Sequence, residues 1–320
     1  MKAFIARKYS AITDLENGDI DKPVAGENEV LIKVKAAAVN PADLMVISGK
    51  SGGKFMHANS FPFPVGYDFS GEVEEAGRKV SNLKPGDEVF GFLEYSKKNR
   101  QGTIAEYVTA AADTVALKPP ETTFVNAASA ATAGAAALMG LKSKGNLQPG
   151  QRIFINGASG GVGGYAVCIA KNMGAEVWAS CSSKNSDYVR SLGADNVLDY
   201  KAVNLKELPE KFDLFLDVAA RSSFCKTSSI LTPGGTFVSL MPMSPGFAIG
   251  KLKSLMGSKS CRGVIVKPDK AALTQLAVWM KEDRLDVAID SSFSLADASA
   301  ALLKLESGRA TGKIAIVVEA

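Results

Sequence analysis

The chain has 320 residues, enough for two domains of ordinary size. Its 46% apolar and 22% charged residues are typical of a soluble protein, and no uninterrupted apolar run reaches the roughly 20 residues that a membrane-spanning helix needs. The net charge of +4 is small and no long basic run is present, which argues against a nucleic-acid partner and leaves at most peripheral contact with an anionic membrane.

The N-terminus and the cysteines indicate the compartment. Residues 1–7 have the pattern of a first strand and lack the apolar core and cleavage-like site of a signal peptide. Cys168, Cys181, Cys225 and Cys261 are far apart and show no metal-ligand spacing, so we expect reduced thiols. These features predict a cytoplasmic protein, with peripheral attachment to an organelle membrane as the alternative.

The first 120 residues are rich in short strand patterns and turns. Residues 29–36 alternate apolar and polar side chains as a half-buried strand does. A glycine-bent strand, a strand after a Pro-Gly turn and a further strand are predicted at 65–73, 83–91 and 103–108. This part of the chain is therefore predicted to be a compact β-rich domain.

The pattern changes after an alanine-rich segment at 124–141, which is predicted to be a helix. Strands then alternate with helical runs, and we expect these strands at 152–156, 176–180, 196–199, 212–217, 234–239 and 263–266. Such alternation is typical of a doubly wound parallel sheet. Two amphipathic helices at 269–282 and 295–305 precede a closing strand at 313–318, which we expect to pair back onto the first domain.

A glycine cluster follows the first strand of this second region. The spacing Gly157-x-x-Gly160-x-x-Gly163 lies between the strand and a helix-like run. Strand, glycine turn and helix is the arrangement that holds a dinucleotide pyrophosphate on a helix N-terminus. The residues predicted to bind the dinucleotide here are Gly157, Ala158, Ser159, Gly160, Gly161 and Val162. The alternative is a glycine-rich turn with no ligand.

The end of the second strand indicates which dinucleotide binds. An NAD site usually carries an acidic residue about 20 residues past the glycines, which binds the ribose 2′-hydroxyl. Residues 180–185 contain no carboxylate and instead offer Ser182, Ser183 and Lys184. Two hydroxyls and a cation suit a 2′-phosphate, so the predicted cofactor is NADPH. The alternative for Lys184 is a solvated lysine at a helix start.

Several motifs in one order resemble a known family. They lie at 36–44, 63–73, 83–90, 157–163, 192–200 and 308–313. Along nearly its whole length the chain resembles the zinc-independent quinone oxidoreductase branch of the medium-chain dehydrogenase/reductase superfamily. It is also similar to chloroplast-envelope quinone oxidoreductase homologues, relatives that reduce activated double bonds of enones.

This resemblance implies an α/β fold with two domains. Residues 1–122 and 267–320 are expected to form a discontinuous GroES-like β-rich catalytic domain, and 123–266 a Rossmann domain that binds NADPH. A cleft between them is expected to hold the nicotinamide. The resemblance also implies a homodimer joined through the edges of the Rossmann sheets.

The positions of the zinc ligands in metal-dependent relatives carry other residues here. Those relatives have a cysteine near Asn40, where this chain has Val-Asn-Pro, and a Gly-His-Glu where it has Gly66, Tyr67 and Asp68. The single histidine, His57, has no histidine or cysteine nearby in sequence. A zinc site needs at least three well-placed ligands, so we expect no metal. We expect His57 in a loop near the mouth of the cleft, and the alternative is a role in proton transfer to the substrate.

Chemistry without a metal favours acceptors that are already electrophilic. Quinones and α,β-unsaturated carbonyls accept hydride at carbon while charge moves to a distant oxygen, so the protein mainly positions the reactants. The resemblance implies catalytic roles for Asn40, Asp43 and Tyr67, and cofactor contacts for Thr132, Tyr200 and Arg309. The alternatives are structural roles. Asn40 would be a turn residue and Asp43 a helix-start carboxylate. Tyr67 would be a core aromatic and Thr132 a small residue packed in a helix. Tyr200 and Arg309 would likewise be structural.

Two other functions fit the same fold. One is an enoyl-thioester reductase, although relatives with that activity carry a tyrosine proton donor where residues 48–55 have none. The other is a protein that binds NADPH without catalysing a reaction.

Overall fold

The computed structural model describes residues 1–318, which form two compact units. Unit 1 comprises Met1–Thr132, Lys267–Glu282 and the chain from Ala288 onward. Unit 2 comprises Ala133–Val266 and Asp283–Val287. Each unit has its own sheets and its own buried apolar side chains, and each is described by itself below.

Unit 2 is built on a six-stranded sheet whose order is β11-β10-β9-β12-β13-β14. All of its pairings are parallel. The strands are β9 (Arg152–Asn156), β10 (Glu176–Cys181), β11 (Asn196–Asp199), β12 (Phe212–Asp217), β13 (Leu231–Ser239) and β14 (Ser260–Gly263). Counted along the chain this order is 3-2-1-4-5-6, the order of a Rossmann sheet, which confirms the predicted fold class.

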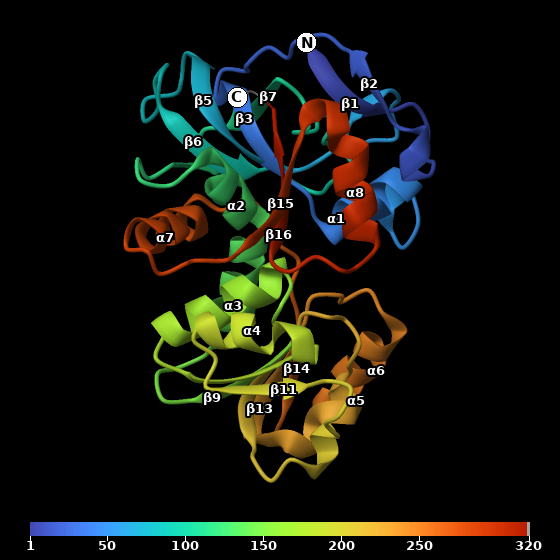
Figure 1. Ribbon diagram of the computed structural model, residues 1–320, viewed down its shortest axis with the longest axis vertical. Helices are drawn as coiled ribbons and strands as arrows, with labels where there is room; N and C mark the ends of the chain where they lie inside the picture. Colours follow the sequence, from blue (N-terminus) through green and yellow to red (C-terminus); the bar gives the residue numbers. More distant parts are fainter. Residues whose placement is uncertain (319–320) are drawn as a thin grey trace. The chain divides into compact units, whose positions relative to one another are not determined.

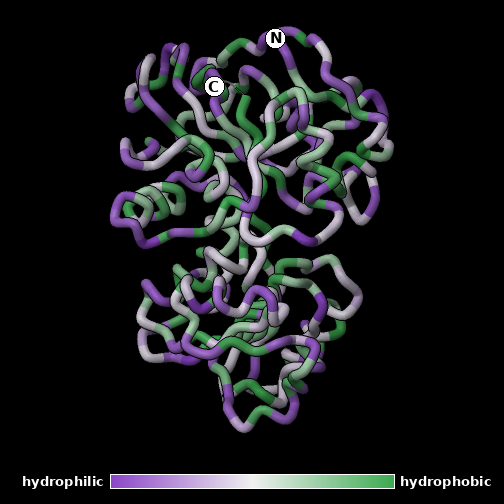
Figure 2. The backbone as a smooth tube through the Cα atoms, viewed as in Figure 1, coloured by the Kyte–Doolittle hydropathy of each residue, from purple (hydrophilic) through white to green (hydrophobic). Residues whose placement is uncertain are grey.

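Helices connect these strands and lie on the two faces of the sheet (Figure 1). They are α3 (Gly161–Asn172), α4 (Ser186–Ser191), α5 (Phe224–Thr227) and α6 (Pro245–Ser254). Because both faces are covered, neighbouring residues on one strand are buried on opposite sides, as Ile153 and Phe154 are. The Phe154 and Phe215 rings stack with centroids 5.1 Å apart on one of these faces. Figure 2 shows the result as hydrophobic strands between hydrophilic loops.

Two strand boundaries in unit 2 differ from the prediction. β13 begins at Leu231, before the Pro-Gly-Gly turn, because the register with β12 shifts and lets that turn bulge out of the ladder. β14 covers Ser260–Gly263 and not 263–266. Its pairing of Cys261 with Phe237 places the thiol in the core, and the more strongly β-branched residues lie after the ladder has ended.

Unit 1 contains a seven-stranded sheet of order β15-β16-β3-β5-β6-β8, with β7 also paired to β3. Its strands are β3 (Glu29–Ala38), β5 (Asp68–Ala76), β6 (Glu88–Phe92), β7 (Tyr107–Ala111), β8 (Val115–Leu117), β15 (Ile289–Ser294) and β16 (Lys313–Val317). A three-stranded sheet of order β2-β1-β4 joins β2 (Glu16–Asp19), β1 (Lys2–Ala6) and β4 (Phe63–Pro64). The closing strand β16 pairs antiparallel with β3, as the sequence predicted.

Unit 1 also contains helices that pack against these strands or against one another. They are α1 (Pro41–Ser48), α7 (Lys270–Lys281), α8 (Ala298–Glu306) and the first part of α2 (Phe124–Leu138). α8 contacts β15, β16 and α1 (Figure 1). On α2, Ala128 packs against Ala36 and Ala38 of β3, and such small side chains allow the helix to approach the strand closely.

The helix formed by α2 and its π-helical continuation is apolar and long. By length and hydropathy alone, Phe124–Lys144 is the one described segment that could cross a membrane. However, 78% of its most apolar window is buried inside the protein, as in the core helix of a globular domain.

Candidate functional site

A buried polar cluster forms in unit 1 around the end of β3. Asn40 follows this strand and caps α1, whose first residue is Pro41. The Asp43 Oδ2 atom accepts a hydrogen bond from the Asn40 backbone N–H at 2.8 Å. This reciprocal cap explains why Asn-Pro-x-Asp begins a helix here, since it satisfies an N–H that the first turn leaves free. It also fixes the position of both side chains.

A lysine from the far end of the chain completes the cluster. Lys313, the first residue of β16, donates from Nζ to Asn40 Oδ1 at 2.7 Å and to Asp68 Oδ2 at 3.2 Å. Asp68, the first residue of β5, also accepts from Asn40 Nδ2 at 2.9 Å and from the Thr132 backbone N–H at 3.1 Å. Asp68 is fully buried and the Lys313 side chain is 4% exposed. The ion pair therefore holds β3, β5, β16 and α2 at one point.

Asp43 is the second carboxyl group in this cluster. Burial raises its pKa to about 7, and the negative charge of Asp68 adds to this effect. The hydrogen bond from the Asn40 N–H, the Lys313 charge and the Tyr95 hydroxyl act in the opposite direction. Tyr95 Oη donates to Asp43 Oδ1 at 3.3 Å. Asp43 therefore changes its protonation state close to neutral pH.

Tyr67 and His57 lie beside this cluster. The Tyr67 ring stacks on Tyr95 at 3.9 Å between centroids. Its hydroxyl donates to the Met56 carbonyl at 3.0 Å, so the contact of 2.9 Å to His57 Nδ1 must be a bond that the imidazole donates. That tautomer leaves His57 Nε2 as a buried acceptor with no partner among the described residues. Burial lowers the His57 pKa to about 4, so the ring is neutral near pH 7.

These contacts extend the sequence analysis in two ways. His57 lies in a loop, as we expected, but it is 1% exposed and its side chain is buried in the unit. Asp68, Tyr95 and Lys313 were not singled out as site residues. The signal for Lys313 was its place in the motif at 308–313, but a sequence motif does not reveal which distant carboxylate its ammonium meets.

Two hydroxyl groups on α2 lack partners. The Oγ atoms of Ser129 and Thr132 are buried and make no hydrogen bond among the described residues. Residues three apart on a helix lie on the same face, so the two hydroxyls are neighbours. An unpartnered buried hydroxyl is a position where a bound molecule or a water can donate or accept, and Thr132 therefore fits the predicted cofactor contact.

The glycine loop of unit 2 has the geometry of a dinucleotide cradle. Gly157 has φ +91°, and its N–H, like that of Ala158, donates to the Ser180 carbonyl. A Cβ atom on Gly163 would lie 2.2 Å from the Gly157 carbonyl oxygen, so helix α3 can approach the loop only with glycine there. A Cβ atom on Gly160 would meet nothing within 4 Å. Gly160 therefore leaves open space at the N-terminus of α3, where a pyrophosphate fits.

The other predicted cofactor residues lie in both units. Ser182 precedes a short 3-10 helix over Ser183–Asn185, and Ser183 and Lys184 are exposed. The Tyr200 backbone N–H donates to the Cys181 carbonyl, which brings Tyr200 beside the end of β10. Arg309 is an exposed residue of unit 1, on the turn between α8 and β16.

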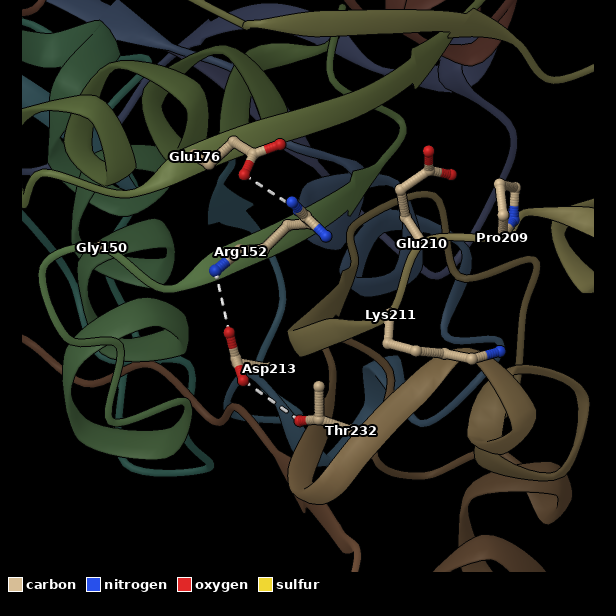
Figure 3. A pocket seen from close by; sticks show the side chains of 8 residues that line it. All are labelled: Gly150, Arg152, Glu176, Pro209, Glu210, Lys211, Asp213 and Thr232. Carbon is tan, nitrogen blue, oxygen red and sulfur yellow. Dashed lines mark hydrogen bonds and ion pairs between the residues drawn. The ribbon is translucent and has the colours of Figure 1, made fainter.

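A pocket on unit 2 lies at the opposite end of the strands. It is lined by Gly150, Arg152, Glu176, Pro209, Glu210, Lys211, Asp213 and Thr232 (Figure 3). Arg152 pairs with Glu176 at 2.9 Å, and its backbone N–H donates to Asp213 at 2.9 Å. These groups satisfy one another. Since open α/β sheets bind ligands at the carboxyl ends of their strands, the pocket is not the candidate site.

Within residues 1–318, no group of three or more His, Cys, Asp and Glu side chains is arranged to hold a metal ion. The polar cluster of unit 1 instead combines two carboxyl groups, an ammonium, an amide and the Tyr95 phenol. Such a set can bind and orient a polar substrate atom and can hold a proton. The predicted absence of a metal remains a prediction.

Comparison with known proteins gives consistent results. Residues 26–120 match the family model of the alcohol dehydrogenase GroES-like domain, and residues 192–316 match that of the zinc-binding dehydrogenases. The trans-enoyl reductase pgmF of Aspergillus terreus is 33% identical, over 92% of this chain and 87% of its own length. The chloroplastic quinone-oxidoreductase QR1 of Triphysaria versicolor is 33% identical, over 94% and 93%. The structure of a quinone oxidoreductase from Coxiella burnetii has a TM-score of 0.91 at 30% identity and covers 100% of this chain and 99% of that one.

The two loop glycines have separable roles. We expect Gly163→Ala to lower the free energy of unfolding by about 1–3 kcal/mol, because its methyl group overlaps the Gly157 carbonyl. Gly160→Ala has open space for its methyl group and is expected to change stability by less than about 1 kcal/mol, while weakening dinucleotide binding. Urea unfolding and a nucleotide titration measure the two effects. A Gly163→Ala protein as stable as the parent would contradict this assignment.

Asp43 makes stability depend on pH with a defined sign. Its pKa is about 7 in the folded protein against the ordinary 3.8, so folding takes up a proton between these values. This contribution lowers the free energy of unfolding as pH rises, by at most about 1.4 kcal/mol per pH unit. We expect Asp43→Asn to remove this slope in urea unfolding between pH 5 and 8. The matched control is Asp187→Asn, because that side chain is fully exposed. An unchanged slope in Asp43→Asn would contradict the assignment.

Proposed function

Because the chain belongs to the medium-chain dehydrogenase/reductase superfamily, with quinone oxidoreductases among its homologues, we propose that this oxidoreductase transfers hydride from NADPH to quinones or to the double bond of α,β-unsaturated carbonyls. The observation that carries the proposal is the buried cluster around Asn40. It offers hydrogen-bond donors to an oxygen that becomes negative, and it has no set of metal ligands.

The residues of the cluster have different proposed roles. Bound NADPH supplies the hydride. In the proposed site, the Asn40 amide binds the acceptor oxygen, on which charge develops as the acceptor is reduced. Asp43 holds the Asn40 backbone and keeps a proton near neutral pH. Tyr67 has its hydroxyl engaged by Met56 and His57, so its proposed part is to support the Tyr95 ring beside Asp43.

The nicotinamide cofactor is proposed to be NADPH and not NADH. Ser182, Ser183 and Lys184 follow β10 with no carboxylate among them, and two of these side chains are exposed and free to meet a phosphate. Tyr200 lies beside the same strand end. The open side of Gly160 is the proposed seat of the pyrophosphate, together with the N–H groups at the start of α3. The unpartnered Thr132 hydroxyl is proposed to contact the nicotinamide half, and Arg309 the 2′-phosphate.

An enoyl reductase is the second candidate function. It is favoured by the relative named trans-enoyl reductase, which matches the chain as well as the quinone oxidoreductase does. It is disfavoured by the absence of a tyrosine at 48–55. A protein that binds NADPH without turnover is the third reading, which only an activity assay separates from the first two.

The proposed assembly is a homodimer joined at the edge of the unit 2 sheet. The edge strand β14 pairs on one side only, with β13. In and beside α6, apolar side chains are exposed: Met243, Ile249, Leu252, Leu255 and Met256. Exposed apolar side chains that gather on one segment favour an interface there. The proposed compartment remains the cytoplasm, with an organelle membrane as the alternative; the chloroplastic relative supports an organelle but says nothing of a membrane.

The mass in solution tests the dimer. We expect twice the chain mass in light scattering and the mass of one chain for Leu252→Glu, which places a charge on the apolar patch. Val24→Glu is the control, because Val24 is an exposed apolar residue of unit 1, away from the proposed interface. A parent protein with the mass of one chain at all concentrations would refute the homodimer.

The activity assay follows the oxidation of NADPH and, in parallel, of NADH. The acceptors are simple quinones and a graded set of enones. We expect turnover that a chelator does not affect and that prefers NADPH, with the preference reduced in Lys184→Ala. Turnover on enoyl thioesters alone would favour the second candidate. Tight NADPH binding without turnover on any acceptor would refute the proposed activity and favour the third reading.

A further inference from the structure

We infer that Lys313 and Asp68 are positioning residues that fix the orientation of the Asn40 amide, and that the Lys313 charge strengthens this amide as a donor to the oxygen of the acceptor. This inference rests on the proposed hydride transfer and adds two residues to it. The contacts that carry it are those of Lys313 Nζ to Asn40 Oδ1 at 2.7 Å and of Asn40 Nδ2 to Asp68 Oδ2 at 2.9 Å.

The chemistry of the two partners determines how the amide is oriented. An ammonium group has only donors, so the atom of Asn40 that contacts Lys313 must be the oxygen. An ionised carboxylate has only acceptors, so the atom that contacts Asp68 must be the nitrogen. With the amide turned round, each of these two contacts would be repulsive. The amide plane of Asn40 is therefore held at both ends.

One hydrogen of the amide nitrogen remains for a ligand. The nitrogen carries two hydrogens, and Asp68 takes one of them. The Lys313 charge at the amide oxygen draws electron density away from the nitrogen, which makes the remaining N–H a stronger donor. Asn40 is 6% exposed, so this effect acts in a medium that screens charge poorly. The arrangement transmits the positive charge of Lys313 to the acceptor without moving a proton.

The proposed reaction needs such a donor when negative charge forms on the oxygen of the acceptor. With an enone, hydride forms a new C–H bond at the β-carbon, and the double-bond electrons shift to give an enolate with its negative charge on oxygen. The cofactor is oxidised and the enone reduced. A proton from water then completes the second C–H bond at the α-carbon. A preorganised N–H at the enolate oxygen stabilises the transition state more than the substrate.

A purely structural role is the alternative for this ion pair. Buried ion pairs seldom add stability relative to packed apolar residues, because removing both charges from water offsets their attraction. The pair also ties β16 to β5, so its loss could lower stability without any specific effect on turnover. The experiment must therefore measure kcat of folded protein, together with the coupling between Lys313 and Asn40.

The experiment compares kcat for Asn40→Ala, Lys313→Met and the double variant, with weakly electrophilic enones and with quinones. We expect Asn40→Ala to lower kcat on the enones about 100-fold, as when one oxyanion donor is removed. Lys313→Met is expected to approach that loss with a similar KM, and the double variant to lose no more than Asn40→Ala. The loss of kcat should be smaller with quinones, which need less stabilisation of the negative charge on oxygen.

Two further variants separate a specific effect on kcat from the effect of leaving a buried charge unpaired. Asp68→Asn combined with Lys313→Met removes both charges and leaves no unpaired ion, so it is expected to fold and still to lose kcat. Lys118→Met removes another buried lysine of unit 1, which pairs with Glu88 at 2.9 Å, and it is expected to change stability but not kcat.

The outcomes separate this inference from the proposed function. The positioning role would be overturned if the fold-losses in kcat of Asn40→Ala and Lys313→Met multiply in the double variant. It would also be overturned if the variant with Asp68→Asn and Lys313→Met keeps the kcat of the parent protein. Either result leaves the proposed reductase activity standing. A loss of kcat in Lys118→Met as large as in Lys313→Met would also overturn the positioning role. A parent protein without turnover would refute the proposed function and this inference together.

Discussion

A single buried ion pair determines the arrangement of the polar cluster in unit 1. Lys313 and Asp68 are 245 residues apart in the chain and meet where β3, β5, β16 and α2 come together. Removing one partner of such a pair typically costs about 3–5 kcal/mol, because it leaves an uncompensated buried charge. The pair therefore constrains the strands, and through them it fixes Asn40, whose amide both charges contact.

In unit 2 the equivalent constraint is steric. The parallel sheet brings the glycine loop to the carboxyl end of β9, and two glycines act there in different ways. Gly163 permits the close approach of α3 to the loop, while Gly160 leaves space unfilled. Because α3 packs closely at Gly163 and the space beside Gly160 is open, the loop can hold an anion on backbone N–H groups without moving. A dinucleotide site requires this property.

Much of the fold could be predicted because its signals are local. Each strand-helix repeat of unit 2 carries its own apolar pattern, and a parallel order follows from the alternation of strands and helices. The prediction was weaker where pairing with a neighbour decides the boundary. β13 includes a bulged turn, and β14 begins three residues before the segment with the strongest strand propensity, because register with the adjacent strand overrides local preference.

The sequence by itself determined the fold class, the glycine loop and the lack of zinc-ligand residue types at the positions of the relatives' ligands. These depend on neighbouring residues and on fixed spacings. Only the tertiary structure decided that Lys313 meets Asn40, that Tyr95 meets Asp43 and that His57 is buried against Tyr67. The physical reason is that hydrogen bonds and desolvation act between side chains that are close in space, and a linear pattern does not encode which distant partners folding brings together.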